Sequence, residues 1–384
     1  MNKFFTQLKR LLSLTWLKYF KLFKNNELSI KRRIRQFKKQ AIKSPVIQCD
    51  IGLGYYDPNG GALNYKKALK YFRLAANQGY AEGQYFLGLM YYHGHGVKQS
   101  YSQALTYYKL AADQHYVQAQ YELAAMYYDG KGTEQSYVDA LNYYQLAANQ
   151  NDANAQFFLG LMYYQGNGAA QSYLEALKYY ELAAKQGSVV AQYYAGFMYD
   201  MGLGVTQNYG EALKYYELAA NQGMANAQYN LGVMYEHGEG IKQNYSTALK
   251  YYELSAEQGL ADAQFGLGSL YYNGNAVEQS YIEALKYYEL AANQGMAKAQ
   301  CNLAVMYENG EGIKQNYSTA LRYYQLSAEQ GLADALFGLG TMYYHGKGIT
   351  QDLKKAQELF RQACDNGSAQ GCEAYQFLTS NMNY

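Results

Sequence analysis

The sequence predicts an all-α fold, a solenoid built from helix pairs that repeat every 36 residues. Proline, which interrupts helices, accounts for only 2 of the 384 residues, and most of the 37 glycines recur at fixed places in the repeat. A constant period of this size is typical of stacked helical repeats. An alanine marks the period: Ala68, Ala104, Ala140, Ala176, Ala212, Ala248, Ala284, Ala320 and Ala356.

Charge is divided unequally between the N-terminal end and the repeats. Residues 1–44 contain 13 lysines and arginines and one acidic residue, Glu27, whereas the remainder contains 20 basic and 30 acidic side chains. Duplex binding needs clustered lysines and arginines, so the acidic repeats are not expected to bind nucleic acid. The basic run at 31–39, KRRIRQFKK, resembles a nucleic-acid or nuclear-localisation patch in composition, but a solvated linker is the commoner explanation.

Residues 1–24 fit an amphipathic helix with basic side chains opposite an apolar side. Such a segment binds anionic membrane surfaces, because aromatic side chains enter the headgroup region and basic ones face the lipid charge. Lys9, Arg10 and Lys18 interrupt the apolar run, so a secretory signal and a bilayer-spanning helix both fit poorly. Packing on the repeats, absence of fixed structure, and organelle or export targeting stay open as alternatives. The residues expected at the membrane surface are Phe4, Phe5, Leu8, Leu12, Trp16 and Phe23.

The repeats are expected to occupy residues 45–384, after the basic segment and linker at 1–44. Pro45 suits the first turn of a helix, where its missing N–H has no partner. Residues 45–60 match only the second half of the repeat. A lone second helix should therefore precede about eight full repeats, of which the atypical one at 345–384 caps the array.

The first helix of each repeat has the pattern Tyr-x-x-Ala-Leu-x-Tyr-Tyr-x-Leu-Ala-Ala, as at 101–112. At 100° per residue the second tyrosine of the doublet faces the core, while Tyr107 and Leu110 widen the apolar face to more than half of the helix. Neighbouring helices should therefore cover it on both flanks. The residues left over form a polar strip.

The second helix has the pattern Ala-Gln-x-x-Leu-Gly-x-Met-Tyr, as at 227–235. Its small residue allows a neighbouring helix to approach closely, at Gly88, Ala124, Gly160, Gly196, Gly232, Gly268, Ala304 and Gly340. The first helix should end at a left-handed residue, Gly in most repeats but His115 and Asn151 in two of them. The recurring Gly-x-Gly pairs follow a helix rather than a strand, so they are helix ends and not phosphate-binding loops.

These patterns, recurring from Pro45 to Phe377, resemble the Sel-one-like repeat (SLR) family, relatives of tetratricopeptide solenoids. The resemblance implies a right-handed superhelix of antiparallel helix pairs that acts as a protein-binding scaffold or adaptor and not as an enzyme. The last repeat resembles the cysteine-bearing variety of the family, in which the pair corresponding to Cys364 and Cys372 forms a disulfide in an oxidising compartment. Free thiols are an equal alternative, and the unpaired Cys49 and Cys301 favour a reducing, cytoplasmic location.

No cofactor or metal site is expected. His93, His237 and His345 share one place in different repeats, so they are too far apart to bind one ion, and His93 with His95 offers two ligands where zinc needs three or four.

The polar side of the first helices is the expected partner surface, with tyrosine hydroxyls exposed on the concave face and lysines paired to the glutamates three residues after them. We call this surface the first-helix strip. Its residues are Lys70, Arg73, Tyr107, Lys109, Tyr143, Gln145, Tyr179, Glu181, Tyr215, Glu217, Tyr251, Glu253, Tyr287 and Glu289.

The expected function is a non-catalytic scaffold or adaptor that binds a protein or peptide as a monomer, with a possible tether to the membrane through residues 1–24. Residues 211–268 and 283–340 differ at only seven positions, and such duplication suits a binding surface better than a single active site. Two alternatives follow from family resemblance alone. They are β-lactam binding or hydrolysis, as described for cysteine-rich relatives, and a role as an exported bacterial effector acting on host proteins.

Overall fold

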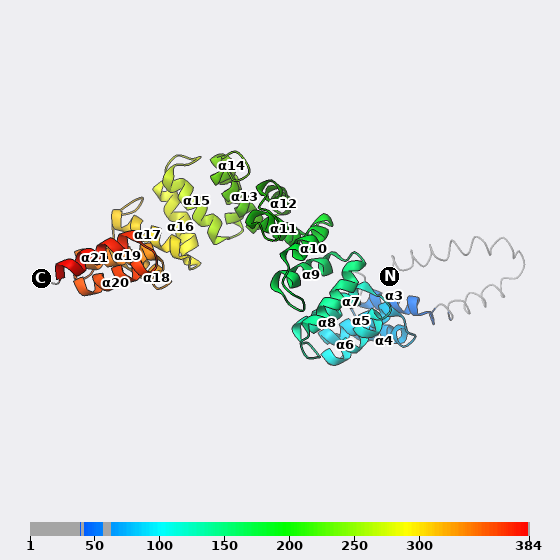
Figure 1. Ribbon diagram of the computed structural model, residues 1–384. Coiled ribbons are helices and arrows are strands. Elements are labelled where there is room, and N and C mark those ends of the chain that lie inside the picture. Colours follow the sequence, from blue (N-terminus) through cyan, green and yellow to red (C-terminus); the bar gives the residue numbers. More distant parts are fainter. Residues whose placement is uncertain (1–38, 40–41, 57–62, 383–384) are drawn as a thin grey trace, which may run out of the picture. The chain divides into compact units, whose positions relative to one another are not determined.

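The computed structural model describes residues 39, 42–56 and 63–382, and in these residues all regular structure is helical (Figure 1). The predicted membrane-binding segment, residues 1–24, lies outside the described residues. Among the described helices, none combines the length and the apolar character that crossing a bilayer requires. The fold class predicted from the repeat period, an all-α solenoid, is confirmed.

The chain divides into two compact units, Met1–Ala191 and Gln192–Tyr384. The second helices of the first unit are α3 (Pro45–Tyr56), α5 (Ala81–His93), α7 (Val117–Asp129) and α9 (Ala153–Gln165). Its first helices are α4 (Tyr65–Ala76), α6 (Tyr101–Ala112), α8 (Tyr137–Asn149) and α10 (Tyr173–Lys185). Helix α3 coincides with the lone second helix that the half repeat predicts.

The second unit begins inside α11 (Val189–Met201) and follows the same order. Its first helices are α12 (Tyr209–Asn221), α14 (Tyr245–Glu257), α16 (Tyr281–Asn293), α18 (Tyr317–Ala328) and α20 (Leu353–Asp365). Its further second helices are α13 (Ala225–His237), α15 (Ala261–Asn273), α17 (Ala297–Asn309), α19 (Ala333–His345) and α21 (Ala369–Met382). Within each unit, consecutive helices pack side by side.

In most repeats the core is an aromatic ring set against a glycine of the preceding second helix, and an alanine takes the place of the glycine at Ala124 and Ala304. The ring of Tyr108 lies so close to Gly88 that a Cβ atom added there would stand 2.7 Å from a ring carbon. Tyr252 and Gly232 repeat the arrangement at 2.5 Å. The tyrosines in this place, predicted to face the core, are at most 4% exposed: Tyr108, Tyr144, Tyr180, Tyr216, Tyr252, Tyr288 and Tyr324. The close approach predicted for the small residues is therefore confirmed.

Helix ends are fixed by side-chain caps and left-handed residues. First helices begin after a serine, an asparagine or, for α20, Asp352, whose side chain accepts a backbone N–H three residues on, as Asn244 does from Thr247 at 3.0 Å. His115 and Asn151 adopt the predicted left-handed conformation, with φ of 61° and 67°. The structure adds Ala276, whose φ is 66° at a place where other repeats have the second glycine of Gly-x-Gly.

Pairs of glutamines, which the sequence analysis did not predict, join successive repeats. From α3 to α17, a buried glutamine on each second helix accepts a hydrogen bond from the glutamine at the end of the next first helix, at 2.7–2.9 Å, whereas α19 has Leu336 at this place. The pairs are Gln48–Gln78, Gln84–Gln114, Gln120–Gln150, Gln156–Gln186, Gln192–Gln222, Gln228–Gln258, Gln264–Gln294 and Gln300–Gln330. These bonds fix the register between neighbouring repeats.

The prediction that neighbours cover the whole apolar side of the first helix was wrong for its second leucine. Leu110 is 44% exposed, and the corresponding leucines of the other repeats are 36–47% exposed. Ala111 and Ala112, which follow it, are buried. The neighbouring helices contact the alanine and tyrosine side of the first helix, so the leucine is left at the edge of the contact.

Candidate functional site

The structure places the residues of the first-helix strip at different depths. Lys70, Arg73 and Lys109 are exposed, whereas Tyr179 and Tyr215 are buried, with 8% and 6% of their surface exposed. The other members are half-buried: Tyr107, Tyr143, Gln145, Glu181, Glu217, Tyr251, Glu253, Tyr287 and Glu289. The prediction that the tyrosines of the strip present exposed hydroxyls was therefore wrong for Tyr179 and Tyr215.

Each strip tyrosine, like Tyr71 and Tyr323 at the same place in other repeats, stacks on a tyrosine from the end of the preceding second helix. The ring centroids lie 5.6–6.2 Å apart, and the planes differ by at most 18°. The stacked pairs are Tyr55–Tyr71, Tyr91–Tyr107, Tyr127–Tyr143, Tyr163–Tyr179, Tyr199–Tyr215, Tyr235–Tyr251, Tyr271–Tyr287 and Tyr307–Tyr323. One ring face of each strip tyrosine is thus occupied from within the chain.

In three repeats a lysine lies over the strip tyrosine and pairs with a carboxylate. The Nζ atom of Lys178 lies 5.2 Å from the ring centroid of Tyr179 and 2.9 Å from Glu175. The same arrangement joins Lys214 to Tyr215 and Glu211, and Lys286 to Tyr287 and Glu283. Hydrogen bonding to Glu175 and Glu283 is the main reason that the pKa values of Lys178 and Lys286 are raised.

These contacts correct the predicted ion pairs. Lys214 and Lys286 pair with the glutamates three residues before them, and within the described chain neither pairs with Glu217 or Glu289. The reason is that helical side chains lean toward the helix N-terminus, so a lysine reaches the preceding turn more easily than the following one.

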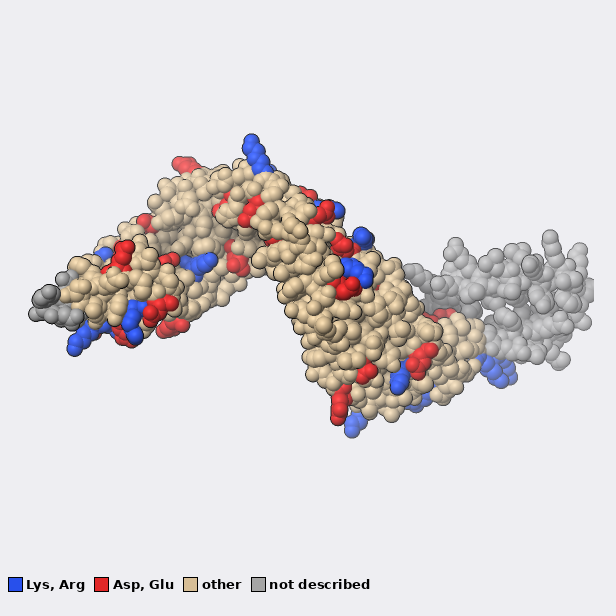
Figure 2. All heavy atoms as spheres, viewed as in Figure 1, with Lys and Arg blue, Asp and Glu red and all other residues tan. Residues whose placement is uncertain are grey.

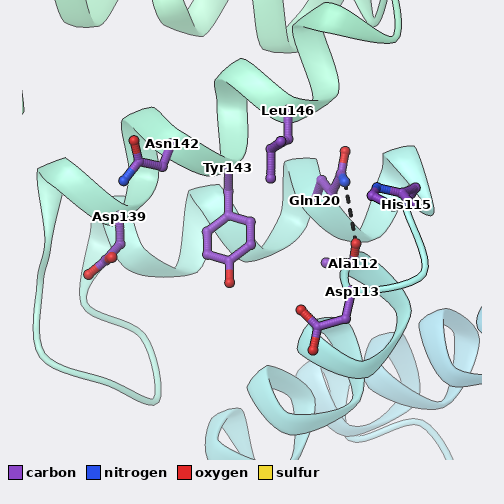
Figure 3. A pocket seen from close by; sticks show the side chains of 8 residues that line it. All are labelled: Ala112, Asp113, His115, Gln120, Asp139, Asn142, Tyr143 and Leu146. Carbon is purple, nitrogen blue, oxygen red and sulfur yellow. Dashed lines mark hydrogen bonds between the residues drawn. The ribbon is translucent and has the colours of Figure 1, made fainter.

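A cavity of about 430 Å³ opens along the strip between α6 and α8 (Figure 3). Tyr143 and Leu146 of α8 point into it, together with Asp113 from the end of α6, while Asp139 and Asn142 lie to one side of Tyr143. Ala112, His115 and Gln120 complete the lining, and the Gln120 amide donates to the Ala112 carbonyl at 3.3 Å. Tyr143 is the strip residue that the structure brings to this cavity.

Burial raises the pKa of the Tyr143 hydroxyl, and negative charge on Tyr127, Asp113 and Asp139 raises it further. The two aspartates therefore lie close enough to act on the hydroxyl. The sequence analysis did not select Asp113, Asp139 or Asn142. The sequence does contain a signal for this pocket, because Asn142 stands where the next four repeats have a lysine: Lys178, Lys214, Lys250 and Lys286.

A second cavity, of about 440 Å³, lies on the last helix pair, between α19, α20 and α21. Phe337, Phe360 and Leu378 contribute apolar side chains, and Phe377, at its edge, is 58% exposed.

Two of the four cysteines form a disulfide, and His95 packs against an aromatic ring. Cys364 and Cys372 are joined by a disulfide between α20 and α21. Cys49 and Cys301 are buried thiols, and burial raises the pKa of Cys301 to about 12, which makes it unreactive at neutral pH. The His95 ring stacks on Tyr65 at 4.3 Å, and the described residues contain no cluster of three metal-ligating side chains.

On the face seen in Figure 2, acidic and basic side chains of the described helices stand near one another, and most of the surface is uncharged. The described repeats therefore show no single-sign patch of the kind that binds a nucleic-acid duplex on this face.

Comparison with known proteins identifies the repeat. The family model described as Sel1 repeat matches nine successive segments: 48–80, 81–116, 117–152, 153–188, 189–224, 225–260, 261–296, 297–332 and 333–368. No curated protein matches the chain.

Two solved structures are similar over most of the chain. One is a protective antigen present in uropathogenic Escherichia coli strains and displaying an SLR fold, with 28% identity and a TM-score of 0.67, covering 93% of this chain and 91% of that one. The other is a Sel1 repeat protein from Oxalobacter formigenes, with 28% identity and a TM-score of 0.66, covering 88% of this chain and 94% of that one.

Proposed function

The chain belongs to the Sel1 repeat family, and on this basis we propose that it is a non-catalytic scaffold that holds an extended protein or peptide segment along its first-helix strip. Proteins of this family generally serve as protein-interaction scaffolds, and their solenoid is typically non-enzymatic. The finer part of the proposal, the strip as the binding face, comes from the contacts described above.

The observation that carries the proposal is the repetition of one contact group along the strip. Successive repeats present a stacked tyrosine pair with a half-exposed leucine beside it, and three of them add a lysine and a glutamate. Aromatic rings with few rotatable bonds bind partners at small entropic cost. An extended chain would meet these groups at regular intervals, because each repeat places them in the same position.

Charge reversal on the strip tests this function. We expect the triple variant Lys70→Glu, Arg73→Glu, Lys109→Glu to lose, in pull-downs quantified by mass spectrometry, proteins that the unchanged chain retains. The matched control reverses three exposed lysines that lie in the loops before first helices, Lys98, Lys242 and Lys314, with the same change in net charge. Retention by the control and loss by the strip variant, at equal helicity, supports the proposal. Equal retention by both variants would place the partner surface elsewhere.

We further propose that residues 1–24 attach the scaffold to an anionic membrane surface. The support is their sequence alone, in which lysines and arginines alternate with aromatic and leucine side chains at helical spacing.

A further inference from the structure

Comparison of equivalent places in the repeats shows that Tyr143 keeps the carboxylate of the lysine-bearing repeats but lacks their cation. Tyr107 also lacks a cation, because Thr106 stands at the lysine place, but there the carboxylate is replaced by Gln103. In α10, α12 and α16 the third residue of the helix is a glutamate, the sixth a lysine and the seventh the strip tyrosine. In α8 the same places hold Asp139, Asn142 and Tyr143. The carboxylate and the ring are kept, but a neutral amide replaces the ammonium group that elsewhere contacts both.

The place left by the missing lysine is hollow. The cavity of about 430 Å³ between α6 and α8 is lined by Asp139, Asn142 and Tyr143, as well as by Leu146. Asp113 adds a second carboxylate, and Figure 3 shows it directed into the space beside Tyr143. In four other repeats the residue at its place is a neutral asparagine: Asn77, Asn149, Asn221 and Asn293.

The charge of this pocket is not neutralised by the described residues. Asp139 accepts a hydrogen bond from the Ser136 hydroxyl at 2.6 Å, and neither aspartate forms an ion pair within the described chain. Lys109 stands one turn before Asp113 on α6 but is not within ion-pair distance of it in the structure. His115, from the connecting turn, and Tyr143 are the further titratable side chains that line the pocket.

We propose that this pocket binds the guanidinium group of an arginine from the extended partner, in the place that a lysine of the chain fills in other repeats. The proposal deepens the proposed function, since it names the side chain that the scaffold recognises. The chain itself shows that the ligand fits such a place, because the guanidinium carbon of Arg322 lies 4.9 Å from the ring centroid of Tyr323. A guanidinium both stacks on an aromatic ring and donates to carboxylates in a fixed planar arrangement.

The test is direct binding of a small probe to the full chain. The probe is the blocked peptide acetyl-Gly-Arg-Gly-amide, titrated calorimetrically at pH 8, where imidazole side chains carry little charge. The comparison probe contains citrulline, which has the shape of arginine without its charge. We expect the citrulline peptide to bind at least about tenfold more weakly, because it loses the cation–π and ionic contacts. Equal affinities, or no binding of the arginine peptide, would overturn the proposal.

Variants taken from the chain's own repeats locate the binding. Asn142→Lys introduces the residue found in the following repeats, so the variant should fold normally. Because the new lysine fills the pocket from within, the affinity for the arginine peptide should fall by about tenfold. The double variant Asp113→Asn, Asp139→Asn should lower the affinity for the arginine peptide by a similar factor. Glu134→Gln removes one exposed carboxylate outside the pocket and should leave the affinity within about twofold. Unchanged affinity in Asn142→Lys, with normal helicity, would refute this location.

The peptide titration and the pull-down together distinguish failure of the pocket proposal from failure of the scaffold proposal. Probe binding that responds to these variants supports the pocket even where the pull-down finds no partner. A partner that is lost by the strip variant but retained by Asn142→Lys and by the double aspartate variant would support the scaffold and refute the pocket as its arginine site.

Discussion

At the scale of single residues, the buried tyrosines have the same packing but different hydrogen bonds. The hydroxyl of Tyr252 donates to Glu236 at 2.5 Å, and that of Tyr324 donates to Glu308 at 3.0 Å. The residue equivalent to Glu236 and Glu308 in the repeat of Tyr108 is Tyr92. The buried Tyr108 hydroxyl has no hydrogen-bond partner among the described residues. A buried polar group without a partner costs free energy of folding, whereas a bonded one is near neutral or favourable.

Replacing each tyrosine with phenylalanine should therefore have opposite effects. We expect Tyr108→Phe to leave the free energy of unfolding unchanged or to raise it by up to about 1 kcal/mol, because it removes an unpaired hydroxyl. Tyr252→Phe should lower it by about 1–2 kcal/mol, because Glu236 loses its donor. Urea denaturation followed by circular dichroism measures both. Equal losses in the two variants would show that Tyr108 has a partner in solution.

At the scale of helices and turns, the conformation of Ala276 is the clearest departure from the repeat. Its φ of 66° lies in the left-handed region, where the equivalent residues Gly240 and Gly312 have φ of 69° and 70°. The place is also crowded, since a Cβ atom added at Gly312 would stand 2.6 Å from the carbonyl carbon of Tyr281. The turn before α16 therefore carries strain that the equivalent turns at Gly240 and Gly312 do not.

Ala276→Gly should raise the free energy of unfolding by about 1 kcal/mol, because alanine is disfavoured in this conformation and glycine is not. The reverse change at the equivalent place one repeat later, Gly312→Ala, should lower it by a similar amount or more. Repeat arrays can open in parts, so hydrogen exchange of amides in α15 and α16 gives the local measure. Unchanged exchange in Ala276→Gly would mean that the turn relaxes around the alanine.

The helices could be predicted because their pattern is periodic, and the contacts between them only in part. Periodicity was sufficient to place Tyr108 in the core and to assign left-handed turns to His115 and Asn151. It could not choose between the glutamates on either side of Lys214, since both are three residues away and only side-chain direction decides. The pocket beside Tyr143 was missed because it depends on which lysine is absent, and a search for recurring residues does not register an absence.

At the scale of the whole molecule, the basic N-terminal segment and the acidic repeats suit different partners. Residues 45–384 contain ten more acidic than basic side chains and would be repelled by an anionic bilayer, whereas residues 1–44 would be attracted to it. Attachment through the N-terminal end would leave the first-helix strip available to a protein.

Deletion of residues 1–24 should therefore abolish sedimentation of the protein with liposomes that contain phosphatidylserine. Each basic residue near an anionic surface contributes about 1 kcal/mol, so binding should also fall steeply as salt is raised. Liposomes of phosphatidylcholine alone are the control and should bind little of either protein. Undiminished sedimentation of the deletion variant with the anionic liposomes would exclude this segment as the anchor.

The glutamine bonds have a consequence for how the gene can change. Each bond joins residues 30 positions apart in the chain, and each inner repeat carries one partner for the repeat before it and one for the repeat after it. Loss or gain of a whole 36-residue unit by unequal recombination would therefore leave every remaining bond with a matching partner. The near-identical stretches 211–268 and 283–340 have the form that such an event leaves behind. The lineage can thus adjust the length of its scaffold in whole repeats without redesigning the joint between them.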